Sequence, residues 1–194
     1  MYIVIEGIDT AGKSTQLDLL RENYINAIFT KEPGGTVVGQ EIRSMVLDGD
    51  ISSKAAEMFL FLADRAEHFT KVIKPNMDKL IISDRSFISG ISYAKEYDVD
   101  KLYELNMIAL ENMKPDLIVV LVLSRDDLTY RLSQKSHDKI ELRGIDYLLD
   151  IQNNMINILK NLEMNHLVID AAKDIDEINK IICMHISNNL SSIE

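Results

Sequence analysis

Residues 2–15 read YIVIEGIDTAGKST, and this stretch decides the fold. Residues 2–5 form a short apolar run, which is typical of a strand buried on both faces of a parallel sheet. Residues 7–14 then match the spacing Gly-x-x-x-x-Gly-Lys-Ser, and a helix is predicted from Lys13 onward. A glycine-rich loop between a strand and a helix offers an anion its backbone N–H groups and the positive end of the helix dipole. The pattern therefore predicts a phosphate-binding loop.

The chemistry of such a loop assigns roles to its side chains. Lys13 is expected to contact the β- and γ-phosphates of a nucleotide, and the Ser14 hydroxyl is expected to ligate magnesium. The predicted nucleotide-binding residues are Gly7, Ile8, Asp9, Thr10, Ala11, Gly12, Lys13, Ser14 and Thr15. The loop alone does not separate kinases, GTPases, ATPases and non-catalytic nucleotide-binding proteins, because all of them use it.

Further apolar runs complete the predicted sheet. Residues 80–82 and 117–123 read as buried strands, and residues 27–29 and 166–169 are weaker candidates. The stretches between them carry apolar residues at helical spacing. Strands that alternate with helices predict an α/β fold of three layers, a P-loop NTPase fold with a five-stranded parallel sheet flanked by helices. We expect one domain over residues 1–194, with a mobile LID, or flap, at about 133–144, where the sequence is polar.

Composition excludes several classes of protein. The chain has 194 residues, of which 46% are hydrophobic, so a sizeable core is expected. Acidic residues number 31 against 21 basic ones, and a formal net charge of -10 argues against a broad nucleic-acid-binding face. No window reaches the roughly 18 apolar residues of a membrane span. A single cysteine, Cys183, excludes an internal disulfide framework and favours a reducing compartment, with the cytoplasm as the expectation.

Two of the nucleotide-binding classes lack support in the sequence. A GTPase needs an Asn-Lys-x-Asp motif, but here Asn179-Lys180 is followed by two isoleucines in a predicted helix. A motor ATPase is usually larger than this chain. A kinase of a small molecule fits better, because it must gather several cations at the C-terminal edge of the sheet to neutralise two sets of phosphates. The Asp84-Arg85 pair near the end of a predicted strand supplies one such cation.

Several further motifs carry a family resemblance along nearly the whole chain. They are Glu32-Pro33-Gly34-Gly35-Thr36, Ile42-Arg43, Phe61-Leu62-Ala63-Asp64-Arg65, Asp84-Arg85, Lys114-Pro115-Asp116-Leu117 and Asp138-Lys139-Ile140-Glu141, besides the phosphate loop with Asp9 at its third position. Together they resemble the bacterial type of thymidylate kinase, a P-loop kinase of nucleoside monophosphates. The resemblance implies that ATP and Mg²⁺ phosphorylate dTMP to dTDP by in-line transfer.

The resemblance also implies roles for single residues. Phe61 stacks on thymine, Arg65 contacts a carbonyl of the base, and Tyr93 closes against the deoxyribose. The implied dTMP-binding residues are Asp9, Arg43, Phe61, Arg65, Arg85, Ser89 and Tyr93, and the implied Mg²⁺ contacts are Ser14 and, through water, Asp84. From the residues alone, Phe61 could equally be core, and Asp9 could cap the loop.

The source of the catalytic cations is inferred from a difference within the family. One subtype carries an arginine in the phosphate loop after the acidic residue, and here that position is Thr10, so the flap should supply the cations. We expect the catalytic residues to be Asp9, Lys13, Arg85, Arg131 and Lys135. The sequence departs from the family pattern at Gly90, which replaces a larger residue, and at Gln152, which replaces an arginine.

The resemblance finally implies a homodimer. The apolar faces of residues 55–73 and 102–113 exceed what one sheet face covers, and the family dimerises through helices there. Two alternatives remain open, namely a kinase of another nucleoside or nucleotide and a non-catalytic nucleotide-binding regulator. The four histidines show no ligand spacing, so no protein-bound transition metal is expected.

Overall fold

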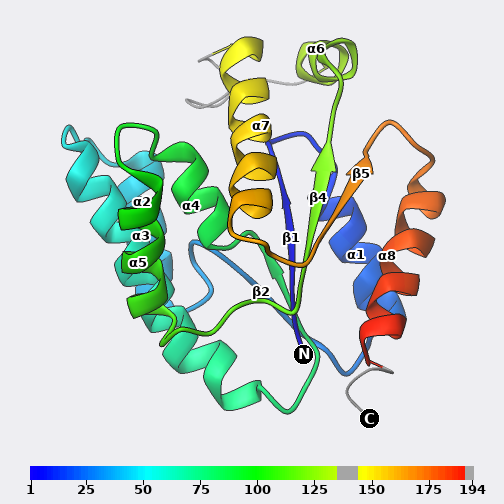
Figure 1. Ribbon diagram of the computed structural model, residues 1–194, viewed down its shortest axis with the longest axis horizontal. Coiled ribbons are helices and arrows are strands. Elements are labelled where there is room, and N and C mark those ends of the chain that lie inside the picture. The colour runs from blue at the N-terminus through cyan, green and yellow to red at the C-terminus, as the bar shows by residue number, and fades with distance from the viewer. Residues whose placement is uncertain (135–143, 191–194) are drawn as a thin grey trace. The chain divides into compact units, whose positions relative to one another are not determined.

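The computed structural model describes residues 1–134 and 144–190 and confirms an α/β fold (Figure 1). These residues form a five-stranded parallel sheet in the order β2-β3-β1-β4-β5, flanked by helices. The strands are β1 (Tyr2–Gly7), β2 (Ile28–Lys31), β3 (Ile81–Asp84), β4 (Leu117–Val122) and β5 (His166–Asp170). The helices are α1 (Lys13–Asn23), α2 (Val37–Asp48), α3 (Lys54–His68), α4 (Phe87–Tyr93), α5 (Val99–Ala109), α6 (Arg125–Ser133), α7 (Ile145–Asn161) and α8 (Ile175–Leu190).

The chain divides into two compact units. The first unit comprises Met1–Val4 and Asn26–Asp116, and the second comprises Ile5–Ile25 and Leu117–Glu194. Strand β1 contributes its first half to the first unit and its second half to the second. The single domain expected over residues 1–194 stays a prediction.

The first unit places β2 beside β3 and packs four helices together. Ile28 pairs with Ile81, and Lys31 pairs with Asp84, in a parallel register. Helix α3 contacts α2, α4 and α5, and Figure 1 shows α2, α3 and α5 side by side. The register matters for function, because it brings the C-terminal ends of β2 and β3, and the loops that follow them, to the same edge.

Helix α3 ends well before Pro75. It begins after Ser53, whose hydroxyl accepts a hydrogen bond from the N–H of Ala56, as expected for an N-cap. The regular α-helix stops at His68. A π-helical turn, η1 (Phe69–Ile73), and a 3₁₀ turn, η2 (Lys74–Asn76), carry the chain on to Pro75. Pro75 lies in the 3₁₀ turn, and the π-helical turn begins at the buried Phe69, directly after the buried His68.

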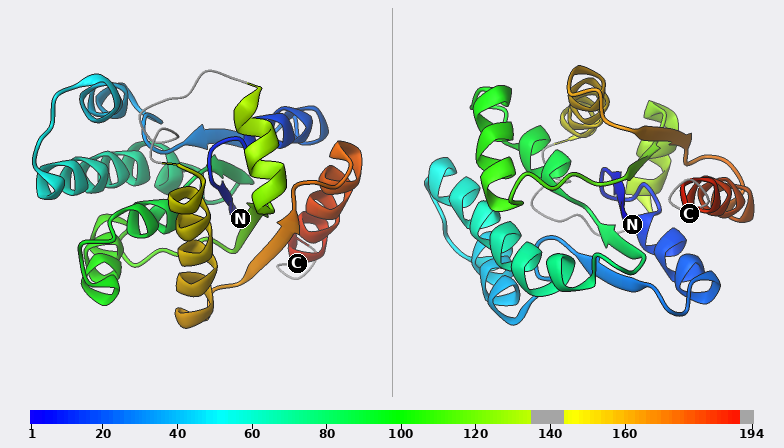
Figure 2. Two further views of the ribbon diagram at one scale, coloured as in Figure 1. Left: turned by 90° about the horizontal axis from the view of Figure 1, so that it is seen from above. Right: turned by 60° about the horizontal axis from the view of Figure 1, so that its bottom comes forward.

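The second unit pairs β4 with β5 in parallel, from Ile118 opposite His166 to Val122 opposite Asp170. Helix α1 packs against α8, as Figure 2 shows, and α6 contacts α7. Met155 on α7 is fully buried in the core. Residues 7–13, between β1 and α1, form the glycine-rich loop of this unit.

Burial separates the strong strand predictions from the weak ones. Every residue of β1 and nearly every residue of β3 and β4 is buried, as their continuous apolar runs predicted. Strands β2 and β5 are partly exposed, because they lie at the two edges of the sheet. Strand β3 ends at Asp84, two residues beyond the predicted end.

No helix within residues 1–134 and 144–190 combines the length and the apolar character needed to cross a bilayer. Of the expected flap at 133–144, residues 135–143 lie outside the described residues.

Candidate active site

The phosphate loop of the second unit depends on backbone angles that few residues adopt. Gly7 has a φ of 145°, and a Cβ atom there would lie 2.7 Å from the carbonyl oxygen of Leu121. Gly12, which precedes α1, has a φ of 93°. Glycine is therefore required at Gly7 both by the backbone angle and by the close approach of β4. These constraints explain the glycine spacing from which the loop was predicted.

Lys13 lies folded along this loop. Its Nζ donates hydrogen bonds to the carbonyl oxygens of Gly7 and Ile8, each at 3.0 Å, and lies 4.0 Å from Oδ1 of Asp9. Only 7% of the lysine is exposed. Two backbone carbonyl groups of the loop thus hold the charge of Lys13 against the loop. The roles expected of Asp9 and Lys13 stay predictions. Ser14, by contrast, is exposed at the start of α1.

The side chain of Arg131 on α6 contacts a backbone carbonyl of the phosphate loop. Its Nη1 donates to the Thr10 carbonyl at 2.9 Å, and its Nη2 donates to the Ala171 carbonyl at 2.6 Å. Both ends of the guanidinium thus bind carbonyl oxygens of the second unit. Lys135, the other flap cation expected to be catalytic, lies outside the described residues.

Gln152 on α7 binds both backbone groups of Leu123, which follows β4. Its Oε1 accepts from the Leu123 N–H at 2.8 Å, and its Nε2 donates to the Leu123 carbonyl at 3.0 Å. Gln152, which replaces a family arginine, therefore satisfies the hydrogen-bonding groups of the buried backbone that follows β4.

Arg85, Ser89 and Tyr93 come together in the first unit. Arg85 follows β3, and its Nη1 donates to the Ser89 hydroxyl at 2.9 Å. Its guanidinium carbon lies 5.8 Å from the centroid of the Tyr93 ring, within cation–π range. The side chain of Arg85, which precedes α4, thus meets Ser89 and Tyr93 of that helix, and all three were expected to bind the acceptor.

The backbone of Arg85 is unusual, because its φ is 70°, in the left-handed region. The Ser83 hydroxyl donates to the Arg85 carbonyl at 2.9 Å and holds this conformation. A non-glycine residue in this region is strained by roughly 1–2 kcal/mol, and such strain clusters at functional sites. Next to it, Oδ1 of Asp84 is buried and has no hydrogen-bond partner among the described residues.

Arg43 on α2 holds the loop that follows β2. Its Nη1 donates to the Pro33 carbonyl at 3.2 Å. Gly34 has a φ of 100°, and a Cβ atom there would lie only 3.0 Å from Cδ of Arg43. The loop therefore requires glycine at a point where the arginine packs closely against it.

Arg65 lies in a buried network that joins three elements of the first unit. Its Nε donates to Oε2 of Glu32 at 2.8 Å, and its Nη1 donates to Oδ1 of Asn106 at 2.5 Å. The other oxygen of Glu32 lies 2.8 Å from Nδ1 of His68, whose Nε2 lies 2.6 Å from the Thr30 hydroxyl. The buried guanidinium of Arg65 thus has an ion-pair partner in Glu32, as expected because an unpaired buried charge is costly.

The aromatic residues of α3 differ in exposure. Phe61, four residues before Arg65, is half-buried, which leaves part of its ring accessible. Phe59 is 57% exposed and so does not belong to the core. Phe61 and Arg65 lie four residues apart on α3 and therefore share one helix face.

Comparison with known proteins decides the family. The family model described as "Thymidylate kinase" matches residues 5–182 of this chain. The chain belongs to the thymidylate kinase family. This confirms the resemblance drawn from the sequence motifs.

Three relatives show that the likeness to this family extends over nearly the whole chain. The thymidylate kinase of Aliarcobacter butzleri is 58% identical over 182 residues, which cover 94% of this chain and 96% of that protein. That of Nautilia profundicola is 54% identical and covers 92% and 93%. That of Wolinella succinogenes is 51% identical and covers 92% and 94%.

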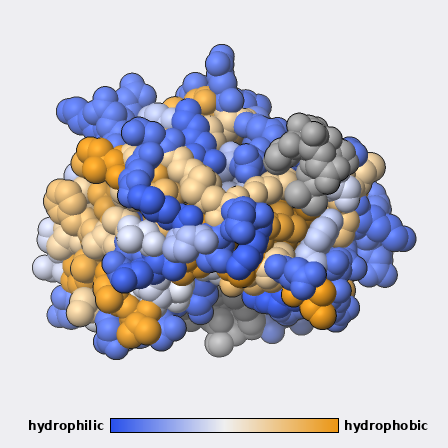
Figure 3. Space-filling view, turned by 90° about the horizontal axis from the view of Figure 1, so that it is seen from below, coloured by the Kyte–Doolittle hydropathy of each residue, from blue (hydrophilic) through white to orange (hydrophobic). Residues whose placement is uncertain are grey.

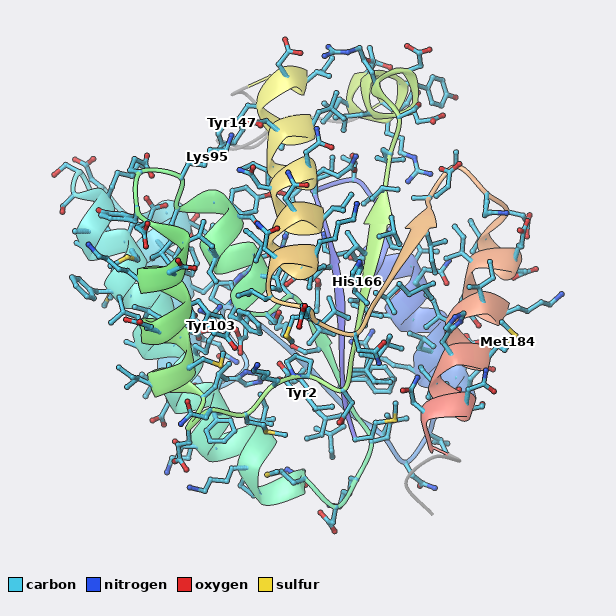
Figure 4. All side chains as sticks on the ribbon, viewed as in Figure 1. Tyr2, Lys95, Tyr103, Tyr147, His166 and Met184 are labelled. Atoms are coloured by element: carbon cyan, nitrogen blue, oxygen red, sulfur yellow. The ribbon has the colours of Figure 1, made fainter. Side chains whose placement is uncertain are left out.

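Sequence reasoning missed the partners of Arg65. Glu32 appeared only as part of a motif, and His68 only as one of four histidines without ligand spacing. Asn106 was not singled out at all. The available signal was weak, namely a polar residue on the buried face of α5 between Leu102 and Leu110. The other described histidines make backbone contacts, such as His166 at the start of β5, whose Nδ1 lies 2.7 Å from the Met164 carbonyl (Figure 4).

Two carboxyl groups of the network titrate differently. Burial raises the pKa of Glu32, but Arg65 and His68 beside it outweigh burial, so the pKa falls below its usual value. For Asp64 burial dominates and, with the Glu32 carboxylate, raises the pKa to about 6. Oδ1 of Asp64 accepts from the Gly34 N–H at 3.0 Å, whereas its buried Oδ2 has no partner among the described residues.

Asp64→Asn should therefore change how stability depends on pH. Because the folded-state pKa of Asp64 lies above its unfolded value, wild-type stability falls as pH rises from about 4 to about 6. The loss amounts to about 2–3 kcal/mol, and an asparagine at this position would avoid it because it does not ionise. Urea unfolding of both proteins between pH 4 and 8 should give a difference that grows in favour of Asp64→Asn as pH rises. A difference that is constant with pH would contradict the prediction.

Proposed function

We propose that this chain transfers the γ-phosphoryl group of ATP to dTMP and releases ADP and dTDP. Membership of the thymidylate kinase family carries the proposal. It is supported by the anion-binding loop in the second unit and by the arginine-containing acceptor cluster in the first. An oxygen of the acceptor phosphate attacks the γ-phosphorus, and the bond from that phosphorus to the bridging oxygen of ADP breaks. No covalent enzyme intermediate is needed.

The residues of the first unit would bind the acceptor. The guanidinium of Arg85 suits a phosphate, because its planar donors match two oxygens at once. Arg43 is a second candidate, and Ser89 and Tyr93 lie against Arg85. Phe61 and Arg65 would contact thymine, which is flat, neutral and rich in carbonyl oxygens.

The residues of the second unit would bind ATP. Residues 7–15 would surround the β- and γ-phosphates with backbone N–H groups, and Lys13 would neutralise charge that builds up during transfer. Asp9 would orient the acceptor through a sugar hydroxyl. Arg131 and Lys135 remain candidates for the cations that complete this neutralisation.

Mg²⁺ fits this chemistry without a protein cage. Within the described residues no three His, Cys, Asp or Glu side chains gather to hold a metal ion. Magnesium, however, is usually bound by one or two protein groups together with phosphates and water. The exposed hydroxyl of Ser14 is a suitable group, and so is Oδ1 of Asp84, which has no hydrogen-bond partner among the described residues. When bound, the ion would neutralise phosphate charge.

Homodimer formation is part of the proposal. Phe59 on α3 and Ile108 on α5 are 57% and 75% exposed, so each of the two expected helix faces presents a large apolar side chain. Figure 3 shows apolar residues, in orange, scattered among polar ones on the face of the molecule seen from below.

We also place the protein in the cytoplasm, because a chain with the single cysteine Cys183 suits a reducing compartment.

An acceptor screen tests the proposed reaction. ADP release would be followed with purified protein, Mg²⁺, ATP and dTMP, dUMP, dCMP, dGMP, AMP, UMP or no acceptor. We expect dTMP to give the highest kcat/KM, with dUMP next and UMP far lower. A better acceptor than dTMP would favour a kinase of another nucleotide. ATP binding without turnover for any acceptor would favour a nucleotide-binding regulator.

A further inference from the structure

The guanidinium of Arg65 is held at two of its three nitrogens. Glu32 accepts a hydrogen bond from Nε, and Asn106 accepts one from Nη1. Nη2 makes no hydrogen bond to the residues that the structure describes. Because a guanidinium is rigid and planar, two fixed nitrogens also fix the direction of the third.

Asn106 is itself oriented by its own helix. Its Nδ2 donates to the Leu102 carbonyl at 2.7 Å, so the amide cannot turn without losing that bond. Its Oδ1 must therefore face Arg65. Asn106 is 2% exposed, which excludes water as an easy substitute partner. Helix α5 is also fixed against α4, since the ring of Tyr103 (Figure 4) packs against that of Phe87 at a centroid distance of 6.1 Å.

Gly90 supplies the space that this orientation needs. It lies inside α4, and its φ is not positive, so the backbone gives no reason for glycine there. Glycine is also disfavoured inside a helix. A Cβ atom at this position would lie 3.2 Å from Nη1 and 3.3 Å from Nη2 of Arg65, closer than a comfortable contact. The guanidinium thus lies directly against the helix at its one residue without a side chain.

We propose that Asn106 and Gly90 are positioning residues for base selection: with Glu32 they aim Nη2 of Arg65 so that it donates to a carbonyl oxygen of the acceptor base. The inference rests on the proposed contact between Arg65 and the base. It specifies which base is chosen, because thymine and uracil present a carbonyl oxygen where cytosine presents an amino group. A fixed N–H donor can bond to the carbonyl oxygen of thymine or uracil but not to the amino group of cytosine, so it favours the first two bases.

The test compares Asn106→Leu with Asn106→Asp. Asn106→Leu should raise KM for dTMP about tenfold, lower the dTMP-to-dCMP ratio of kcat/KM about tenfold, and leave KM for ATP within about twofold. Asn106→Asp keeps an oxygen that can face Nη1 but loses the bond to the Leu102 carbonyl, so it should change both dTMP values less than Asn106→Leu does. Glu104→Leu, at an exposed position of the same helix, is the matched control and should change none of these values.

Gly90→Ala tests the same idea from α4 without emptying the network. It should raise KM for dTMP several-fold and lower the dTMP-to-dCMP ratio, while the thermal midpoint does not fall, because alanine favours a helix. If Asn106→Leu and Gly90→Ala both leave the ratio unchanged, the inference is wrong. Arg65→Lys separates this failure from that of the proposed function, since it keeps the charge beside Glu32 but removes Nη1 and Nη2. If Arg65→Lys also leaves KM and the ratio unchanged, Arg65 does not contact the base.

Discussion

Lys13→Met should lower kcat for dTMP phosphorylation by about a thousandfold. The Nζ of Lys13 is fixed by the carbonyls of Gly7 and Ile8 and is nearly buried, so its charge acts in a site of low dielectric. A fixed cation that neutralises the transferring phosphoryl group contributes mainly to the transition state, and removal of one such group costs roughly 10²- to 10³-fold in rate. Coupled measurement of ADP release at saturating ATP and dTMP would give kcat directly.

The same two hydrogen bonds make a second explanation possible, namely that the loop loses its shape without Lys13. Thermal unfolding and ATP affinity of Lys13→Met separate the two, because a collapsed loop would also lose most of its nucleotide binding. Lys54→Met, which removes a lysine from the surface of α3, should retain kcat within about twofold. A kcat within tenfold of wild type for Lys13→Met, with ATP still bound, would contradict the assigned role.

The phosphate loop was predictable because its requirements are local. Gly7 and Gly12 are needed for backbone angles within a few residues of Lys13, so their spacing in the sequence carries the geometry. The contacts of Arg131 could not be predicted in this way. They join it to the carbonyls of Thr10 and Ala171, which lie 121 and 40 residues away. Backbone carbonyls have no signature in a sequence, so only the fold reveals which side chain reaches them.

In the first unit, too, some residues could be named from the sequence and others only from the fold. Arg85 was singled out because it follows a predicted strand, whereas Ser89 and Tyr93 were named only through the family resemblance. Asn106 was missed because nothing in α5 distinguishes a buried asparagine that serves Arg65 from one that merely caps a backbone carbonyl. Gly90 was noticed as a departure from the family pattern, but the reason for it, the guanidinium of Arg65 against α4, depends on a residue 25 positions earlier.

Replacement of Arg85 by glycine and by alanine should give two almost inactive proteins of different stability. Both changes remove the guanidinium that is proposed to hold the acceptor phosphate, so kcat/KM for dTMP should fall about 10²- to 10³-fold in each. The backbone, however, keeps a φ near 70°. Glycine adopts this angle freely, whereas alanine is strained there, so Arg85→Gly should be about 1 kcal/mol more stable than Arg85→Ala. Urea unfolding and ADP release measure the two effects separately.

Asn112 provides the matched control for this pair, because its φ of 65° is also left-handed and it lies exposed beyond α5. Asn112→Gly should exceed Asn112→Ala in stability by a similar amount, with no change in kcat/KM. If the two Arg85 variants unfold at the same urea concentration, the backbone there is not strained; if Arg85→Gly turns over dTMP near the wild-type rate, the guanidinium does not hold the acceptor. The expected combination, strain relieved and activity lost, would mean that the left-handed backbone at Arg85 persists because it directs this side chain to the acceptor.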